Sequence, residues 1–211
     1  SENAIKWDSR HMARDLNKCR ILLSQFTVIT CILVVIFSKP TIPDQFLVHK
    51  IIEFVGYFLV VICALGRVYV SVFIGGFKNQ KLIDYGPFSI VRNPLYSLSL
   101  VGIFGLSLMS VNVIIVCVMP IIFTVLYYSI ICREEARLLA EFAEGYRLYK
   151  AKTPSLLPNF ALYKVPAEIP FKPRFVTLAL IDAIWWFVPF PVFEFIDMFQ
   201  QSGVIPAVKI F

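Results

Sequence analysis

The chain has 211 residues, of which 58% are apolar or aromatic and 16% are charged. Soluble domains are usually about 45–50% apolar and about 25% charged, so the composition excludes an ordinary soluble domain and predicts an integral membrane protein with a single domain, residues 1–211. The formal net charge of +6 does not predict a nucleic-acid partner, because the basic residues lie in the loops between apolar segments.

The five cysteines lie in or beside apolar runs without the spacing of a metal site, and the two histidines, His11 and His49, fall in different loops. We therefore expect membrane-embedded thiols and no bound metal. The first apolar run is long and has no small-residue cleavage site, so we expect no cleavable signal peptide.

Apolar runs predict about five transmembrane helices, since a helix needs about 20 such residues to cross the hydrocarbon core. The third run is long enough for a hairpin, interrupted at Ser110-Val111-Asn112, and Pro120 should kink its second arm. We expect N-terminal spans within 21–74, a polar and hairpin-bearing core at about 77–160, and a C-terminal span at 175–196. The individual runs are 21–37, 46–73, 95–132 and about 175–195.

The loops differ strongly in positive charge. Segments 1–20, 75–94 and 133–174 hold five, three and eight Lys or Arg residues, whereas the opposite side holds only Lys39, Lys50 and Lys209. The positive-inside rule therefore predicts that the N-terminus and these three segments are cytosolic, and five crossings put the C-terminus outside.

Glu53, Arg67 and Asp182 are charged residues that fall within the apolar runs. Glu53 and Arg67 are about 21 Å apart along a helix, so they should not pair, and Arg67 lies toward the basic side, where it could reach a site. Asp182 is either a functional group or the partner in an interhelical hydrogen bond.

The loop GPFSIVRNPLY, residues 86–96, opens on a turn dipeptide and places Pro94 at the start of a helix, where a missing N–H costs nothing. A helix N-terminus beside Arg92 suits a carboxylate or a phosphate. The alternative is an ordinary loop whose arginine reaches the membrane surface.

A charged helix follows the hairpin over residues 133–152 and stops at Thr153-Pro154. Its apolar residues Leu138, Phe142, Tyr146 and Tyr149 recur at 4-4-3 spacing, which predicts one apolar face. The adjacent Glu134 and Glu135 at its membrane end should need partners, and we expect Arg133 and Arg137 to supply them. The alternative is a solvated charged face.

Together the two segments resemble the isoprenylcysteine carboxyl methyltransferase family and its phospholipid methyltransferase relatives. Residues 86–96 resemble that family's G-P-Y-x-x-V-R-H-P-x-Y loop. Residues 134–158 resemble its E-E-x-x-L tail, which runs through F-G-x-x-Y-x-x-Y to a final I-P. The resemblance covers residues 85–158, including the helical hairpin between the motifs.

This resemblance implies a catalytic core at about 77–160 that binds S-adenosylmethionine at the cytosolic face and methylates a lipid-linked or amphipathic acceptor entering from the bilayer. It implies catalytic roles for Arg133, Glu134 and Glu135. The cofactor-binding residues that it implies are Gly86, Pro87, Val91, Arg92, Asn93, Pro94, Tyr96, Tyr146 and Tyr149. The implied partners are this acceptor and membrane lipid, with no metal and no nucleic acid.

Three positions depart from the family pattern. Asn93 stands where the family has His, so no imidazole is available there, while Leu98 and Ala143 replace glycines. A carboxylate acceptor would need no strong base, whereas an amine or a thiol would need Glu134 or Glu135.

Two other functions remain open. One is a membrane reductase of the sterol reductase type that uses NADPH, and the other is a non-catalytic membrane module that keeps the fold. For a methyltransferase, we expect the acceptor to enter beside the small residues Ser97, Ser99 and Gly102 of the hairpin's first arm.

Overall fold

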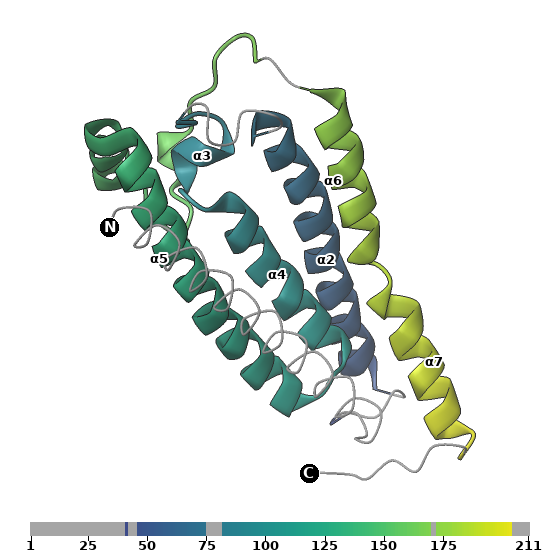
Figure 1. The fold of residues 1–211 in the computed structure, drawn as a ribbon. Helices are drawn as coiled ribbons and strands as arrows, with labels where there is room; N and C mark the ends of the chain where they lie inside the picture. Colours follow the sequence, from purple (N-terminus) through teal and green to yellow (C-terminus); the bar gives the residue numbers. More distant parts are fainter. Residues whose placement is uncertain (1–40, 42–45, 75–81, 170–171, 204–211) are drawn as a thin grey trace, which may run out of the picture.

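The computed structural model describes residue 41 and residues 46–74, 82–169 and 172–203, and within these ranges every regular element is a helix (Figure 1). The all-helical membrane fold expected from the sequence is therefore confirmed. The first predicted span, residues 21–37, lies outside the described residues. In chain order the elements are α2 (Leu47–Ile74), α3 (Pro87–Ile90), α4 (Pro94–Met109), α5 (Val113–Lys152), the 3-10 turn η1 (Phe160–Leu162), α6 (Pro173–Trp185) and α7 (Pro189–Gln201).

Helices stand at the places of the four predicted spans that the structure describes. In the described part of the chain, α2, α5 and the α6–α7 segment are long and apolar enough to cross a membrane, and α4 is a shorter apolar helix of 16 residues. The last span is divided before Pro189, at the first of the two prolines expected to break it. Many large apolar side chains on α2, α5, α6 and α7 are exposed, as lipid-facing side chains are.

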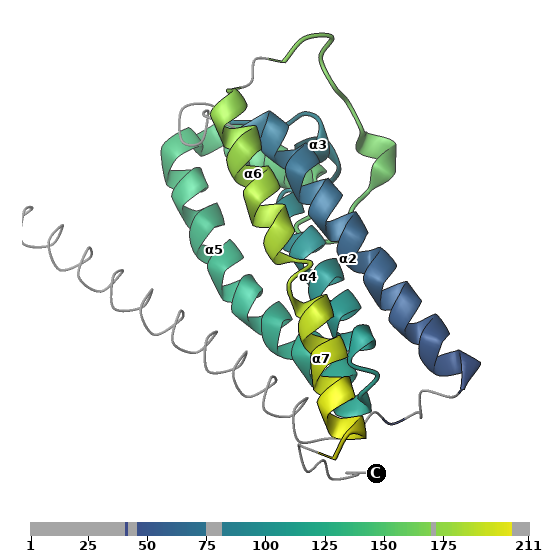
Figure 2. The same ribbon diagram turned by 90° about the vertical axis from the view of Figure 1, so that its right-hand side faces the viewer.

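Helix α4 lies between α2 and α5, with α6 alongside α2 (Figure 2). Small residues bring α2 and α4 into close contact, since a Cβ placed on Gly56 would lie 2.6 Å from the Gly105 carbonyl oxygen. A Cβ on Gly102 would collide with the Trp186 ring and with the Cys63 sulfur. At Gly102 the space expected for the acceptor is therefore already filled by α2 and the end of α6, so that part of the expected entrance is wrong. An entrance beside Ser97 and Ser99 stays a prediction.

Helix α5 spans 40 residues in two helical parts that meet at Ala143, and it contains both the second arm of the hairpin and the charged segment. It is capped by Asn112, whose Oδ1 accepts from the amides of Ile114 and Ile115 at 3.1 and 3.3 Å. The helix continues through Pro120, where a kink was expected, and its backbone leaves helical geometry at Ala143 instead (φ 42°, ψ −115°). Glycine adopts this conformation far more readily than alanine, and Ala143 is one of the positions where the family pattern has glycine.

Candidate functional site

The loop between α2 and α4 owes its shape to one glycine and two prolines. Gly86 has φ 61°, and a Cβ there would collide with the Phe73 ring, so both the backbone and the packing favour glycine. Pro87 and Pro94 occupy the first turns of α3 and α4, as predicted for Pro94. The turn and the two helix starts fix the segment that carries Arg92 and Asn93.

The chain leaving α5 folds back over this loop, and we call residues 153–165 the strap. Backbone hydrogen bonds tie the two segments together. They run from Arg92 N to Pro154 O (2.8 Å), Asn93 N to Ser155 O (3.2 Å), Asn159 N to Ile90 O (2.9 Å) and Gly86 N to Lys164 O (2.7 Å). The Ser97 hydroxyl also donates to Leu156 O at 2.6 Å. The strap is thus held along its whole length by the loop that sequence analysis singled out.

Glu135 is the centre of the ionic contacts beneath the strap. Its Oε1 accepts from Arg92 Nε at 3.0 Å and lies 2.9 Å from Arg92 Nη2, and its Oε2 lies 3.0 Å from Lys150 Nζ. The side chains of Arg92 and Glu135 are both only 10% exposed. Asn93 Nδ2 and the Ser155 hydroxyl also donate to Oε1, each at 3.3 Å. Four side chains from three segments therefore converge on one carboxylate.

Glu135 lies beyond Cys132, outside the apolar run of α5. Burial alone would raise the pKa of its carboxyl, but hydrogen bonds from Lys150 and Arg92 outweigh burial and leave the pKa below its ordinary value. The partners expected from the sequence, Arg133 and Arg137, do not make this contact: Arg133 is exposed, and Arg137 lies 3.8 Å from Glu134. That expectation is therefore wrong for Glu135.

Arg92 uses most of its donors on the protein itself. Its Nη1 donates to the carbonyl oxygens of Lys150, at 3.0 Å, and of Thr153, both at the end of α5. With the bond from Nε to Glu135, three of the five N–H groups of the guanidinium donate, and Nη2 lies 2.9 Å from the same carboxylate. Arg92 therefore fixes the end of α5 and the start of the strap, whereas its place beside a helix N-terminus suggested a cation for a bound carboxylate or phosphate.

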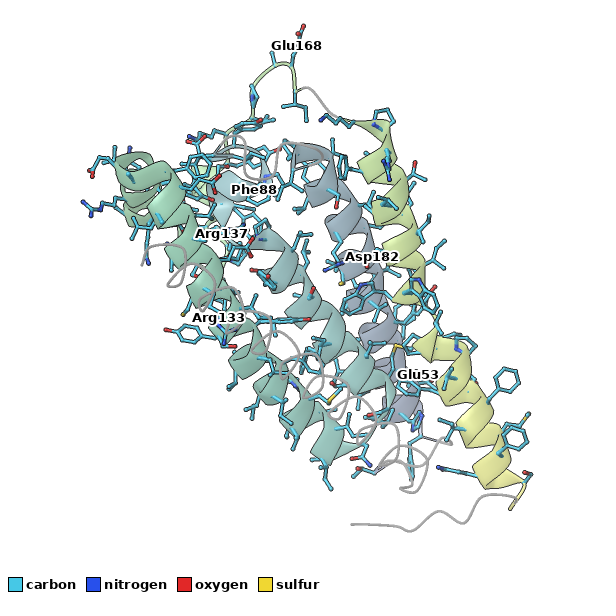
Figure 3. All side chains as sticks on the ribbon, in the orientation of Figure 1. Glu53, Phe88, Arg133, Arg137, Glu168 and Asp182 are labelled. Carbon is cyan, nitrogen blue, oxygen red and sulfur yellow. The ribbon has the colours of Figure 1, made fainter. Side chains whose placement is uncertain are left out.

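A cavity of about 300 Å³ lies between α2, the loop, α4 and α5. Its polar lining includes Glu134, whose Oε2 accepts from the Tyr96 hydroxyl at 3.1 Å, and Arg137. Figure 3 shows Arg137 and Phe88 at the same end of the bundle. The rest of the lining is mostly apolar or aromatic: Ile74, Leu82, Ile83, Phe88, Pro94, Leu95, Tyr127, Leu138, Phe142 and Tyr149, with Arg67, Arg92, Asn93 and Ser99. Such a mixture of apolar walls and few polar groups is typical of a small-molecule site.

The structure divides the predicted site residues into two groups. Those that line the cavity are Arg92, Asn93, Pro94, Tyr96, Glu134 and Tyr149; those that do not are Gly86, Pro87, Val91, Arg133, Glu135 and Tyr146. The second group includes the glycine of the turn and the ionic centre, which support the cavity from outside. The functional roles of both groups remain predictions.

Two tyrosines on the polar end of α5 stand beside this ionic cluster. Tyr149 donates to Phe88 O at 2.7 Å, and burial raises the pKa of its hydroxyl. Among the residues that the structure describes, the buried Tyr146 hydroxyl makes no hydrogen bond of standard geometry, and burial, with the nearby Glu135 charge, raises its pKa to about 12. Both phenols are therefore protonated at neutral pH.

Arg67, which also lines the cavity, belongs to an ion pair that the sequence did not predict. Arg67 donates from Nε and Nη2 to Asp182 Oδ2 at 3.1 and 2.6 Å, and from Nη1 to the Ser99 hydroxyl at 2.6 Å. Its guanidinium also lies 5.6 Å from the centre of the Trp186 ring. Asp182 thus makes an interhelical contact, one of the two roles left open for it. Only the presence of two opposite charges in apolar runs signalled the pair.

These observations define a class: a helical membrane protein with a largely apolar cavity at one end of its bundle, in which a few polar side chains lie. The strap ties the loop that lines this cavity to the end of α5. A family model described as phospholipid methyltransferase matches residues 44–144, which include the loop, α4, most of α5 and both glutamates. The chain belongs to the phospholipid methyltransferase family, as the two motifs indicated.

The chain is also similar to two curated bacterial proteins. It is 31% identical over 153 residues to the cobalt-zinc-cadmium resistance protein CzcN of Cupriavidus metallidurans, a match that covers 72% of this chain and 70% of that protein. It is 24% identical over 179 residues to the nickel-cobalt-cadmium resistance protein NccN of Alcaligenes xylosoxydans xylosoxydans, covering 85% and 84%. No solved structure gives a significant match.

Proposed function

We propose that this protein is a membrane-embedded methyltransferase that uses S-adenosylmethionine and acts on a lipid-linked or amphipathic acceptor. The observation that carries the proposal is Glu134, a carboxylate held by Tyr96 and close to Arg137 in a largely apolar cavity of a phospholipid methyltransferase family member. The cavity lies where the apolar helices meet the loop and the polar end of α5. This position suits an acceptor with a reactive head and an apolar body.

The chemistry of the lining fits this cofactor. S-adenosylmethionine carries an amino group, a carboxylate and a sulfonium cation, and it supplies an electrophilic methyl group when bound. Glu134 would hold the amino group and Arg137 the carboxylate, while the faces of Tyr96, Phe88 and Phe142 would attract the sulfonium. Arg92 and Asn93 would shape the wall, because their donors are engaged by Glu135, Ser155 and the end of α5.

Acceptor chemistry follows from which carboxylate is available. Glu135 is ion-paired and its pKa is lowered, so it is a poor base. Glu134 lines the cavity but would be engaged with the amino group of the cofactor, so neither glutamate is well suited to accept a proton from an amine or a thiol. A carboxylate acceptor would need no such proton transfer, and positioning alone would then provide most of the acceleration. We propose that this end of the bundle faces the cytosol, in accord with the basic residues of segments 75–94 and 133–174.

Calorimetry on the full chain in lipid nanodiscs tests the proposal. S-adenosylmethionine should bind and NADPH should not, and Glu134→Gln should weaken binding at least tenfold. Glu144→Gln is the matched control, because Glu144 lies on the same helix but is 71% exposed and far less constrained. Binding of NADPH alone would indicate the reductase, and binding of neither would indicate the non-catalytic module. Transfer of a labelled methyl group from S-adenosylmethionine to a product that is extracted together with the membrane lipids then tests catalysis itself.

We also propose that the methylation serves tolerance to transition-metal cations, since both curated relatives are named resistance proteins for such metals. A strain lacking this gene should grow less well on cobalt, zinc or cadmium salts, and the natural chain should restore growth. Restoration by Glu134→Gln to the same extent would separate metal tolerance from methyl transfer.

A further inference from the structure

The outer side of the strap is apolar. Leu157 is 83% exposed and Phe160 is 73% exposed, and about half of the surface of Tyr163 and of Val165 is accessible. Four such side chains within nine residues make an exposed apolar surface, which soluble surfaces avoid because water contact with large apolar groups is unfavourable. In a membrane protein, such side chains can instead contact the surrounding lipid.

The strap lies beside the end of α2, and this position indicates whether its outer side faces water or lipid. The Tyr163 hydroxyl lies 2.7 Å from the hydroxyl of Tyr69. Tyr69 is five residues before the end of α2 at Ile74, so it lies about 7.5 Å below that end. Figure 2 shows η1 outside the bundle at the height of α3, whereas the chain toward α6 rises above it. The strap therefore continues the exposed apolar face of α2 to which Leu65 and Tyr69 belong.

Charge and residue type agree with this position. Tyrosines collect at the membrane–water boundary, where the ring meets acyl chains and the hydroxyl meets water. Lys164 lies within the strap and pairs with Asp84 at 2.6 Å, and its side chain is still 61% exposed. In sequence, Lys152 precedes the strap and Arg174 follows it. Long basic side chains at this depth reach lipid headgroups.

We propose that the strap is an interfacial membrane anchor, with Leu157, Phe160 and Tyr163 inserted at the boundary between the headgroups and the acyl chains. The partner is the bilayer in which the helices already stand. Because the strap carbonyls bond to the loop at Arg92 and Asn93, lipid contact with the strap supports the wall of the cavity. This inference rests on the strap's position and does not require the proposed methyl transfer.

Spin labels on the full chain in vesicles of neutral and anionic lipid test the anchor. The five natural cysteines are replaced by alanine, and single cysteines are introduced as Leu157→Cys, Phe160→Cys and Glu168→Cys. Glu168 is the matched control, because it belongs to the same connection but projects above the bundle (Figure 3). Accessibility to oxygen reports lipid, and accessibility to a polar nickel chelate reports water.

Labels at 157 and 160 should favour oxygen and report a depth of about 5–10 Å below the headgroups, while the label at 168 should favour the nickel chelate. Equal access of the chelate to 160 and 168 would overturn the anchor. Protection of 160 from both reagents would overturn it as well, because it would mean a protein partner. If the cysteine-free chain melts at a lower temperature than the natural chain, the test uses p-benzoylphenylalanine at position 160 of the natural sequence. The proposal then requires that this residue crosslink to lipid.

Discussion

Replacing Glu135 with glutamine should release the strap from the loop. Glutamine has nearly the same shape and keeps one acceptor oxygen, but it removes the negative charge that Arg92 and Lys150 share. The Arg92 side chain is only 10% exposed, so its positive charge would be left in a site that water scarcely reaches.

The size of the effect follows from that burial. Removing one member of a buried ion pair costs about 3–5 kcal/mol, whereas an exposed pair contributes about 0–1 kcal/mol. Lys150 is 51% exposed, so its share is small and the lower end of the range, about 3 kcal/mol, is the better estimate for the whole substitution. At 1.36 kcal/mol for each factor of ten, this corresponds to about a hundredfold more frequent opening.

Hydrogen exchange in nanodiscs measures this opening directly. The amides of Arg92, Asn93 and Asn159 donate across the junction between loop and strap, so their protection factors should fall about a hundredfold in Glu135→Gln. Glu144→Gln removes an exposed pair with Arg147 on the same helix and should change nothing. Unchanged protection in Glu135→Gln would refute the reasoning, because the backbone bonds alone would then hold the strap.

Three further predictions concern stability. Ala143→Gly should raise the melting temperature by relieving a backbone conformation that costs about 1 kcal/mol or more, and a lower melting temperature would mean that Ala143 is not strained. Gly102→Leu should destabilise the fold by about 1–3 kcal/mol, because the new side chain would collide with Trp186. Gly145→Ala is the control, since the nearest described atom to a Cβ at Gly145 lies 4.0 Å away and the packing should not change. Equal melting temperatures of the two variants would contradict this prediction. Acidification should loosen the strap as Glu135→Gln does. The folded pKa of Glu135 is below its ordinary value, so its stabilisation of the strap is complete at neutral pH and is lost as the pH falls through the folded pKa. Protection of the same amides that stays constant down to that pH and below would disprove this prediction.

Features that depend on neighbouring residues could be predicted from the sequence. The apolar runs gave the helices, Pro94 gave the start of α4, and Thr153-Pro154 gave the end of α5. Asn112 lies at the interruption of the hairpin and caps the second arm. In each case the physical cause is hydrophobic periodicity or a missing or competing backbone hydrogen bond, which acts within a few residues.

Choices between distant partners could not be predicted. Glu135 has Arg133 and Arg137 close in sequence, yet it pairs with Arg92 and Lys150, because the loop and the end of α5 bring those cations to it. Arg67 and Asp182 are 115 residues apart, and nothing in their neighbourhoods indicates that α2 and α6 lie together. Small residues such as Gly102 are equally compatible with a lipid entrance and with tight packing, and only the position of Trp186 decides between them.

The contact of Arg92 with the carbonyls of Lys150 and Thr153 also has a consequence for biosynthesis. The two carbonyls come 58 and 61 residues later in the chain than the arginine that satisfies them. During translation, α2, the loop and the hairpin are therefore made while Arg92 still lacks all of its partners on α5, and its charge must stay hydrated in that interval. The arrangement of Arg92 that the structure shows is therefore complete only after the chain has been made through residue 153.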